Sequence, residues 1–558
     1  MAWRLGLVAF VYCVIVGWTD ARAQWQPGGN LVTDSVRMYS TIVMIPDASG
    51  GVFMAWEERR DEVSQIYLQR FATGGAALWG EAGIRIVTAD NASVPRLAPD
   101  GAGGVFAAFR TGQFSTDIQV QRLSAEGSSV WSDPVSVSPA SGDGSPTRVM
   151  ADGSGGVIVV WWRQGLIEDR GIFAQRIDAA GNRLWGDDAV RVSNYDGTPD
   201  ICSDGAGGVL ITWADRRVMP HLDIYVQHLT AGGSVSWATD GLVVCDEEET
   251  QNNPQILADG SGGAIVAWRD WGQSPRGIYA QHVDVDGTMG WSPGGQLALS
   301  AESNSGEFAL AAQGDGSAVM ALATGLLGGQ DIRAQRIDAD GQSLWSTQGV
   351  AVCAAAGTQF DPRIAVGADG STFVAWRDQR NGCADVFAQK LSTAGSSLWT
   401  LDGVMVAVFD DDQTDHVVLP RGSEEIHVLW RDERGDQDRL FLLPIGAAGS
   451  GVSEECVTPT AAPEVQRSLM TLQNRPNPFN PTTVFSFTLT ADGPVHLIIY
   501  DVSGRRVATV VDRVYPAGSH TAVWRGEASN GTTLASGVYF ARLSQQGESV
   551  VRKVTLVR

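Results

Sequence analysis

Glycine-rich turns alternate with apolar runs along this chain, as in DGSGGAIVAWRD at 259–270. The run AIVAW has no polar residue, which is typical of a strand buried on both faces. Gly260, Gly262 and Gly263 are expected to supply the positive φ angles of a hairpin turn. Copies of the pattern end their apolar run at residues 56, 109, 162, 213, 268, 322, 376 and 430. The chain therefore carries a repeat of about 54 residues.

A second series of segments keeps the same period and alternates apolar with polar residues, as a half-buried strand does. It runs from QIYLQRF at 65–71 to DVFAQKL at 385–391. A tryptophan follows each member of the series, at 79, 131, 185, 237, 291, 345 and 399. Trp25 lies 54 residues before Trp79 and continues the series toward the N-terminus.

Each repeat is predicted to contain four antiparallel strands, named a to d. Strand a often begins with a proline, which removes no ladder donor there; these are Pro95, Pro146, Pro199, Pro254 and Pro362. Strand b is the apolar run, strand c is the alternating segment, and strand d is a short run such as GVAVC at 349–353. Four strands in a unit of this length are typical of a β-propeller blade, whereas β-solenoid repeats are usually shorter.

The two ends of the array indicate how the ring closes. The last repeat has no tryptophan-bearing strand d, and WQPGGNLV at 25–32 aligns with WGEAGIRIV at 79–87. Closure by this N-terminal strand removes exposed edges. The sequence thus predicts an all-β fold with an eight-bladed β-propeller over 24–447. The alternative is seven blades, if the divergent repeat at 308–345 is not a full blade.

The first 23 residues predict a signal peptide. A basic start at Arg4 precedes an apolar run from Leu5 to Trp18, and the small-residue site at 21–23 predicts cleavage before Gln24. The run is too short for a membrane anchor, which needs about 20 residues. We expect an exported protein with no membrane span after cleavage.

A linker at 448–467 precedes a predicted small immunoglobulin-like β-sandwich at 468–558. Its motifs are LQNRPNPFNPTT (472–483), IYDVSGRRV (499–507), AGSHTAVWRG (517–526), SGVYFARL (536–543) and RKVTLVR (552–558). This segment resembles the C-terminal sorting domains of type IX secretion substrates, which share an immunoglobulin-like fold with a flagellar hook-capping domain. The resemblance implies a secretion machinery as partner and a secreted or cell-surface location in a Gram-negative bacterium.

The net charge of the chain limits the classes of partner that it can bind. Its net charge is −23, yet residues 468–558 carry nine Lys and Arg against five Asp and Glu, which is +4 and leaves −27 for the rest. Such a surface repels phosphate backbones and anionic lipid, so we expect nucleic acid and membrane surfaces to be poor partners. The five cysteines beyond the leader form no C-x-x-C pair. Cys353 and Cys383 are the predicted disulfide, because both fall in loops predicted to share a face around the seventh blade.

The motif Trp-Arg-Asp recurs at 268–270, 376–378 and 430–432 where strand b ends. We interpret it as an Arg–Asp pair that ties neighbouring loops together, because a catalytic pair need not recur in several blades. The basic residue of strand c receives the same structural interpretation. An Arg- and Asp-lined mouth for an anionic or sugar ligand is the functional alternative.

Acidic loops and two histidines are the remaining candidates for a site. The segments DEEE (246–249) and DDDQTDH (410–416) fall on connections between repeats. Asp410, Asp411, Asp412 and Asp415 could hold Ca²⁺, which takes six to eight oxygen ligands; a solvated loop is the favoured alternative. His221 and His416 are candidates on loops of the ligand-bearing face.

No catalytic motif and no cofactor-binding motif is identified in the chain. The predicted function is a glycan- or protein-binding propeller that acts through the face with the b–c and d–a connections. A hydrolase or lyase acting on glycans is the alternative, and it requires carboxylates that converge on one pocket.

Overall fold

The computed structural model describes residues 25–445 and 471–557, with gaps at 26–28, 34–37, 61–62, 87–90, 113–115, 139–142, 164–169, 302–306, 326–328, 347, 408–411, 433–437, 478, 490–491, 502–504, 530 and 546–547. The chain divides into two compact units, Met1–Thr458 and Pro459–Arg558. The predicted signal peptide at 1–23, the predicted linker at 448–467 and Cys456 lie outside the described residues.

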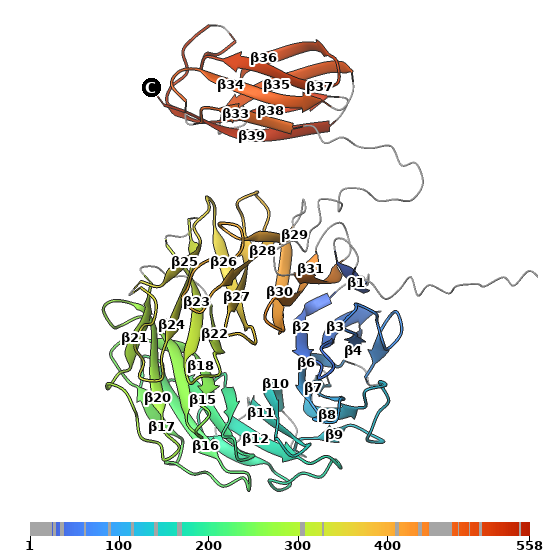
Figure 1. Ribbon diagram of the computed structural model, residues 1–558, viewed down its shortest axis with the longest axis vertical. Coiled ribbons are helices and arrows are strands. Elements are labelled where there is room, and N and C mark those ends of the chain that lie inside the picture. Colours follow the sequence, from blue (N-terminus) through green and yellow to red (C-terminus); the bar gives the residue numbers. More distant parts are fainter. Residues whose placement is uncertain are drawn as a thin grey trace, which may run out of the picture. The chain divides into compact units, whose positions relative to one another are not determined.

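The first unit is a ring of eight four-stranded antiparallel sheets (Figure 1). The innermost strands, a, are β2 (Met38–Pro46), β6 (Ser93–Pro99), β10 (Asp143–Ala151), β14 (Asp200–Ser203), β18 (Gln251–Ala258), β22 (Phe308–Ala312), β26 (Gln359–Val366) and β30 (Gln413–Arg421). Strands b are β3 (Val52–Arg60), β7 (Val105–Thr111), β11 (Val157–Arg163), β15 (Val209–Asp215), β19 (Ala264–Asp270), β23 (Ala318–Thr324), β27 (Thr372–Asp378) and β31 (Glu425–Asp432).

Strands c and d complete each sheet toward the outside of the ring. Strands c are β4 (Val63–Phe71), β8 (Asp117–Leu123), β12 (Gly171–Ile177), β16 (Asp223–Leu229), β20 (Gly277–Val283), β24 (Asp331–Ile337), β28 (Asp385–Leu391) and β32 (Arg439–Ile445). Strands d are β5 (Ile84–Arg85), β9 (Val135–Ser136), β13 (Val190–Ser193), β17 (Leu242–Cys245), β21 (Gln296–Ser300), β25 (Val350–Cys353), β29 (Val404–Ala407) and, in the last sheet, β1 (Asn30–Thr33). Blades 1 to 8 are numbered from the sheet that begins with β2.

The N-terminal strand closes the ring as predicted. β1 pairs antiparallel with β32, so blade 8 combines one N-terminal strand with three C-terminal ones. The indole Nε1 of Trp25 donates to the carbonyl oxygen of Thr73 in blade 1 at 3.1 Å. The divergent sixth repeat forms a complete sheet, β22–β25. The eight-bladed prediction is confirmed, and the seven-bladed alternative is wrong.

The core of the ring consists of apolar layers between neighbouring blades, eight of them within the described residues. Strands b and c supply most of each layer, and the terminal tryptophan of strand b is 0% exposed in β11, β15, β19, β27 and β31. Blade 3 corrects the sequence alignment, because Trp161 is buried and paired like the other tryptophans while Trp162 is partly exposed. Phe109 in blade 2 and Leu322 in blade 6 fill the same place.

The glycines of the a–b turn have two different roles: some adopt positive φ angles, and one permits close approach of a neighbouring strand. Gly260 and Gly262 have φ angles of 84° and 98°, as predicted. Gly263 has no positive φ, which corrects the prediction for that residue. A Cβ there would lie 2.5 Å from the carbonyl oxygen of Val283, so this glycine permits close approach of strand c.

Three of the five prolines of strand a lie at bulges inside the strand rather than at its first position, whereas Pro199 directly precedes β14. The register with strand b shifts across Pro95, Pro254 and Pro362 inside β6, β18 and β26. A bulge leaves one residue unpaired, so the missing N–H of proline costs no ladder bond there. The residues before these prolines have positive φ angles, at Val94 (54°), Asn253 (56°) and Asp361 (55°).

The second unit is a two-sheet sandwich. One sheet has the order β33-β34-β37, with bounds Thr471–Arg475, Thr483–Leu489 and Gly518–Trp524. The other has the order β36-β35-β38-β39, with bounds Arg506–Tyr515, Gly493–Asp501, Gly537–Gln545 and Glu548–Leu556. Phe485, Leu497 and Leu543 are fully buried between the sheets. The all-β prediction is thus confirmed for both units. No helix in the described part of the chain is long and apolar enough to cross a membrane.

Candidate functional site

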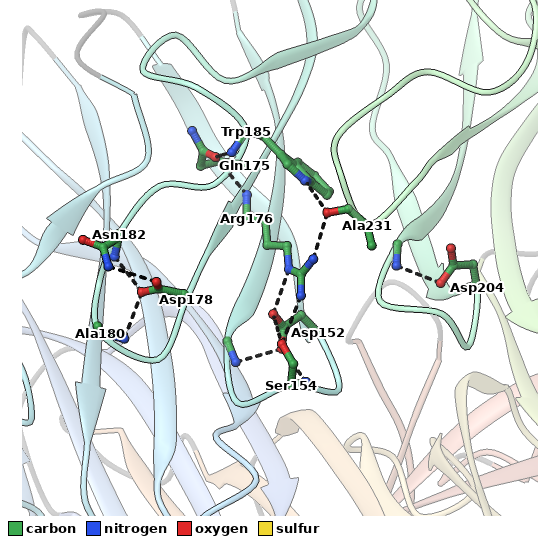
Figure 2. A network of polar contacts seen from close by, with 12 residues as sticks. Asp152, Ser154, Gln175, Arg176, Asp178, Ala180, Asn182, Trp185, Asp204 and Ala231 are labelled. Carbon is green, nitrogen blue, oxygen red and sulfur yellow. Dashed lines mark hydrogen bonds and ion pairs between the residues drawn. The ribbon is translucent and has the colours of Figure 1, made fainter.

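The recurring charged residues on one side of the ring form ion pairs within their blade and hydrogen bonds to the next blade. We call this side, which carries the a–b and c–d turns, the turn face. In blade 3 the Asp152 carboxylate accepts hydrogen bonds from the backbone N–H groups of Ser154 and Gly156, both at 2.8 Å. Arg176 of strand c pairs with Asp152 at 2.8 Å and donates to the carbonyl oxygen of Ala231 in blade 4, also at 2.8 Å (Figure 2). Trp185 Nε1 donates to the same carbonyl at 3.0 Å.

The same contact recurs around the ring. Arg70, Arg122 and Arg336 each pair with the aspartate of their own a–b turn and donate to a carbonyl of the next blade. His228 and His282 take this place in blades 4 and 5, at 3.0 and 2.9 Å from Asp204 and Asp259. Although burial opposes it, these hydrogen bonds hold the pKa of the Asp152, Asp204 and Asp259 carboxyls below the usual value. The basic position of strand c is therefore structural.

The Trp-Arg-Asp motif is also structural, and in its copy at 376–378 the arginine and the aspartate have different partners. Successive side chains of a strand point to opposite faces. Asp378 accepts the indole N–H of Trp376 at 2.9 Å, and Asp270 accepts that of Trp268 at 3.3 Å. Arg377 instead donates to the Gln413 carbonyl oxygen of the next blade at 3.0 Å. The predicted Arg–Asp pair is corrected for this copy, because Asp378 pairs with Arg380 at 2.5 Å and not with Arg377.

His416 is a buried residue of β30 and not a loop residue, which corrects the prediction. It is 1% exposed and occupies the bulge position that proline holds in other blades. Burial lowers its pKa to about 4, against the opposing effect of Asp361, whose Oδ2 lies 3.8 Å from Nδ1; Arg363 and Arg377 lower it further. His221 lies partly exposed in the b–c connection of blade 4. The two candidate histidines belong to different blades and share no contact within the described residues.

The lowered pKa of His416 predicts a pH-dependent stability. The unfolded chain binds a proton at His416 below about pH 6.5, whereas the folded chain does so only near pH 4. Stability is therefore complete above about pH 6.5 and falls as the pH approaches 4, on the order of 2 kcal/mol from this group. Denaturant unfolding at pH 7 and pH 4.5 should show a smaller loss in His416→Gln than in the wild type. His221→Gln is the matched control, and an unchanged loss in His416→Gln would contradict the assignment.

The predicted calcium ligands fall partly outside the described residues, since Asp410 and Asp411 are not among them. Asp412 accepts the backbone N–H of Ala384 at 2.8 Å, and Asp415 pairs with Arg431 at 3.0 Å. Across the described ranges no three His, Cys, Asp or Glu side chains form a group suited to a metal ion. The calcium site stays a prediction.

The predicted disulfide between Cys353 and Cys383 is wrong, because both occur as unbridged cysteines. The Cys353 thiol is buried at the end of β25, 3.8 Å from Asp378 Oδ2, and accepts a hydrogen bond from Arg380 at 3.0 Å. Burial raises its pKa to about 12, so this thiol is not a nucleophile at neutral pH.

A pocket of about 300 Å³ opens on the opposite side of the ring, which we call the loop face because it carries the b–c and d–a connections. Four neighbouring blades, 3 to 6, contribute to it, mainly through strand a. Its polar lining comprises Arg148, Thr198, Asp200, Asn252, Asn253, Gln255 and Glu307. This is the face that the sequence analysis assigned to ligand binding.

Hydrogen bonds between blades fix the wall of the pocket. Asp200 Oδ1 accepts from Arg148 Nε at 2.5 Å, and Oδ2 accepts from the backbone N–H of Ile256 at 3.0 Å. Gln255 Nε2 donates to the Phe308 carbonyl oxygen at 2.6 Å. These bonds link blades 3, 4, 5 and 6 in turn, so the wall is preorganised.

Two side-chain amides in the pocket are available to a ligand. The side chains of Asn252 and Asn253 make no hydrogen bond to any other described residue. Asn253 is exposed and has a φ angle of 56° at the bulge of β18. Val94 and Asp361 have nearly the same φ angle at the same bulge of other blades, so this conformation is a feature of the repeat.

The sequence analysis did not identify Arg148, Asp200 and Gln255 of the pocket wall, although the repeat contains a signal for them. Strand a has one position that pairs with the residue before the strand b tryptophan or its equivalent. In blades 1 to 8 it is held by Val43, Arg96, Arg148, Asp200, Gln255, Ala309, Arg363 and Val417. A position that varies this much inside a regular repeat points to a local role, and comparison of the repeats could have found it.

Comparison with solved structures gives remote similarities. PorZ, described as a surface component of the type-IX secretion system of Porphyromonas gingivalis, is 12% identical, with 95% of this chain and 71% of that chain covered and a TM-score of 0.34. The polysaccharide lyase Uly1 is 10% identical, with 68% and 92% covered and a TM-score of 0.39. Dipeptidyl peptidase 4 of P. gingivalis is 9% identical, with 83% and 65% covered and a TM-score of 0.38. Similarity of this degree does not extend to function.

One family model accounts for the second unit. No curated protein matches the chain. Residues 474–549 match the model described as the FlgD Ig-like domain, in agreement with the two-sheet sandwich and with the predicted immunoglobulin-like fold.

Proposed function

We propose that this protein is an exported β-propeller that binds a glycan or a protein ligand in the pocket on its loop face. The observation that supports this most is the asymmetry of the ring. Eight blades share one scaffold, but only blades 3 to 6 contribute to this pocket with its row of polar side chains. Pockets with a few fixed polar groups are the usual form of a ligand site.

We further propose that the second unit directs export, as a sorting domain for type IX secretion. The proposal rests on the motifs at 472–483, 499–507 and 552–558 and on the predicted signal peptide. The FlgD Ig-like match at 474–549 is compatible with it. The protein would then be secreted or held at the outer surface of a Gram-negative cell, with the secretion machinery as its partner.

A hydrolase or lyase on the same scaffold is the second candidate. Its support is that two carboxylates, Asp200 and Glu307, line one pocket. Binding remains the preferred function, because both carboxylates already have partners. Asp200 accepts hydrogen bonds on both oxygens, and the Oε2 atom of Glu307 lies 3.6 Å from a guanidinium nitrogen of Arg363. Turnover that is lost in Glu307→Gln while binding persists would establish the enzyme and contradict the binding-only function.

Asn253→Gly tests the pocket directly, because glycine keeps the positive φ and removes the amide. Loss of a hydrogen bond of about 1 kcal/mol is expected to weaken ligand binding roughly fivefold, with no loss of thermal stability. Binding would be measured on glycan arrays and by capture of extracellular proteins, with the full mature chain. Val94→Gly is the matched control, since Val94 has a φ angle of 54° at the same bulge in blade 2. Equal affinities of wild type and Asn253→Gly would contradict the placement of the site.

A further inference from the structure

We propose that Trp271 is the stacking wall of a subsite for a neutral sugar, continuous with the pocket described above. The inference rests on the proposed function and names the ligand class. Trp271 follows the Trp-Arg-Asp motif of blade 5, where the other repeats have no aromatic residue. The corresponding residues in blades 1 to 4 and 6 to 8 are Arg59, Gly112, Gln164, Arg216, Gly325, Gln379 and Glu433.

Trp271 lies beside the start of β18, where the pocket begins. Its backbone N–H donates to the Thr250 carbonyl oxygen at 3.2 Å. Arg269 is the cross-strand partner of Asn252, and its guanidinium lies 4.5 Å from the centre of the Trp271 ring. Cross-strand partners place their side chains on the same face of a sheet. The indole and Asn252 therefore both lie next to Arg269.

The loop that carries Trp271 is held in place by the acidic connection at 246–249. A Cβ on Gly272 would lie 1.8 Å from the Glu248 carbonyl oxygen, so the two connections are in close contact. Gln251 is 0% exposed, and its Nε2 donates to the carbonyl oxygens of Glu247 and Glu249 at 3.1 and 3.2 Å. The acidic segment thus has a positioning role, and the partly exposed indole is fixed.

The chemistry of the two parts suits a sugar ring. A pyranose has an apolar C–H face, which packs on an aromatic ring, and hydroxyl groups that both donate and accept hydrogen bonds. The Asn252 and Asn253 amides offer donors and acceptors, and Glu307 offers acceptors. The volume of about 300 Å³ is at the low end of ligand pockets, so it holds about one sugar unit of a longer chain.

Charge selects a neutral sugar over an acidic one. The guanidinium of Arg148 is already paired with Asp200, that of Arg363 lies 3.6 Å from the Glu307 carboxylate, and Arg269 beside the indole is only 4% exposed. Asp200 and Glu307 place two carboxylates in the lining. Residues 1–467 carry a net charge of −27, from −23 for the chain and +4 for residues 468–558. A uronate or sulfated sugar would meet repulsion here.

Calorimetric titration of the full mature protein tests this, with cello-, xylo-, manno- and malto-oligosaccharides as neutral probes and oligogalacturonate as the acidic probe. The wild type should bind at least one neutral probe. Trp271→Ala should weaken that binding by about tenfold or more, whereas Trp271→Phe should stay within about threefold. Gln379→Ala, at the equivalent position of blade 7, is the matched control and should bind as the wild type does.

Three results would overturn the inference, and they separate it from the proposed function. Binding of a neutral probe that Trp271→Ala leaves unchanged overturns the subsite but supports glycan binding. Binding of oligogalacturonate alone overturns the neutral-sugar class. A wild type that binds no oligosaccharide overturns the inference together with the glycan part of the proposed function. Thermal unfolding of each variant shows that it is folded, and Trp271→Phe serves if Trp271→Ala is not.

Discussion

Gly295→Ala is expected to lower the free energy of unfolding of the propeller by about 2–5 kcal/mol. Gly295 precedes β21 with a φ angle of 82°, and a Cβ there would lie 2.4 Å from Cη2 of the buried Trp268 and 2.9 Å from the Ala280 carbonyl oxygen. The backbone conformation alone costs a non-glycine residue about 1–2 kcal/mol. Overpacking against a fixed indole adds about 1–3 kcal/mol, because a close-packed core relaxes only partly.

Gly260→Ala is the matched control for that variant. Gly260 has nearly the same φ angle, 84°, and a Cβ there meets no atom within 4 Å. It should therefore lose only the backbone contribution of about 1–2 kcal/mol. Chemical denaturation of both variants measures the difference. Equal losses would show that contact with Trp268 does not limit this position.

Arg176→Ala is expected to destabilise the propeller by about 2–4 kcal/mol. The substitution removes the ion pair with Asp152, whose side chain is 1% exposed, and the hydrogen bond to the Ala231 carbonyl oxygen of blade 4. Removing one partner of a buried pair is costly because the other charge stays buried. Asp152 keeps its bonds from Ser154 and Gly156, which places the loss below that of a fully orphaned carboxylate.

Arg176→His provides the control, since the chain itself uses histidine at this position in blades 4 and 5. His228 and His282 each keep the contact with their aspartate, at 3.0 and 2.9 Å. Arg176→His should thus lose about 1 kcal/mol, mainly the hydrogen bond to the next blade. Urea titrations of the wild type and both variants make the comparison. A loss in Arg176→His as large as in Arg176→Ala would contradict the role given to the Asp152 pair.

The period of the sequence predicted the architecture because each repeat buries the same residues. Trp25 fitted the series that continues through Trp79, which predicted a closing strand before any pairing was known. The structure confirms this closure in the pairing of β1 with β32. Local alternation was less informative at bulges, where the prolines of strand a and His416 shift the register.

The candidate site was less predictable, because contacts across blades join residues about 50 positions apart. Arg148, Asp200 and Ile256 meet only when blades 3, 4 and 5 stand side by side. The acidic loops and His416, which stand out in the sequence, have local or buried partners instead. Residues that stand out in the sequence are therefore not the ones that line the pocket.

The sequence by itself determined the repeat, its four strands and the closing strand, because repeated burial and turn formation depend on residues close together in the chain. That the divergent sixth repeat is a full blade, which makes the number of blades eight, was decided by the structure. The tertiary structure decided which charged residues serve packing and which line a pocket. The reason is geometric: equivalent side chains of neighbouring repeats meet only once the ring is closed, and only where they differ, as along blades 3 to 6, does a distinct polar surface arise.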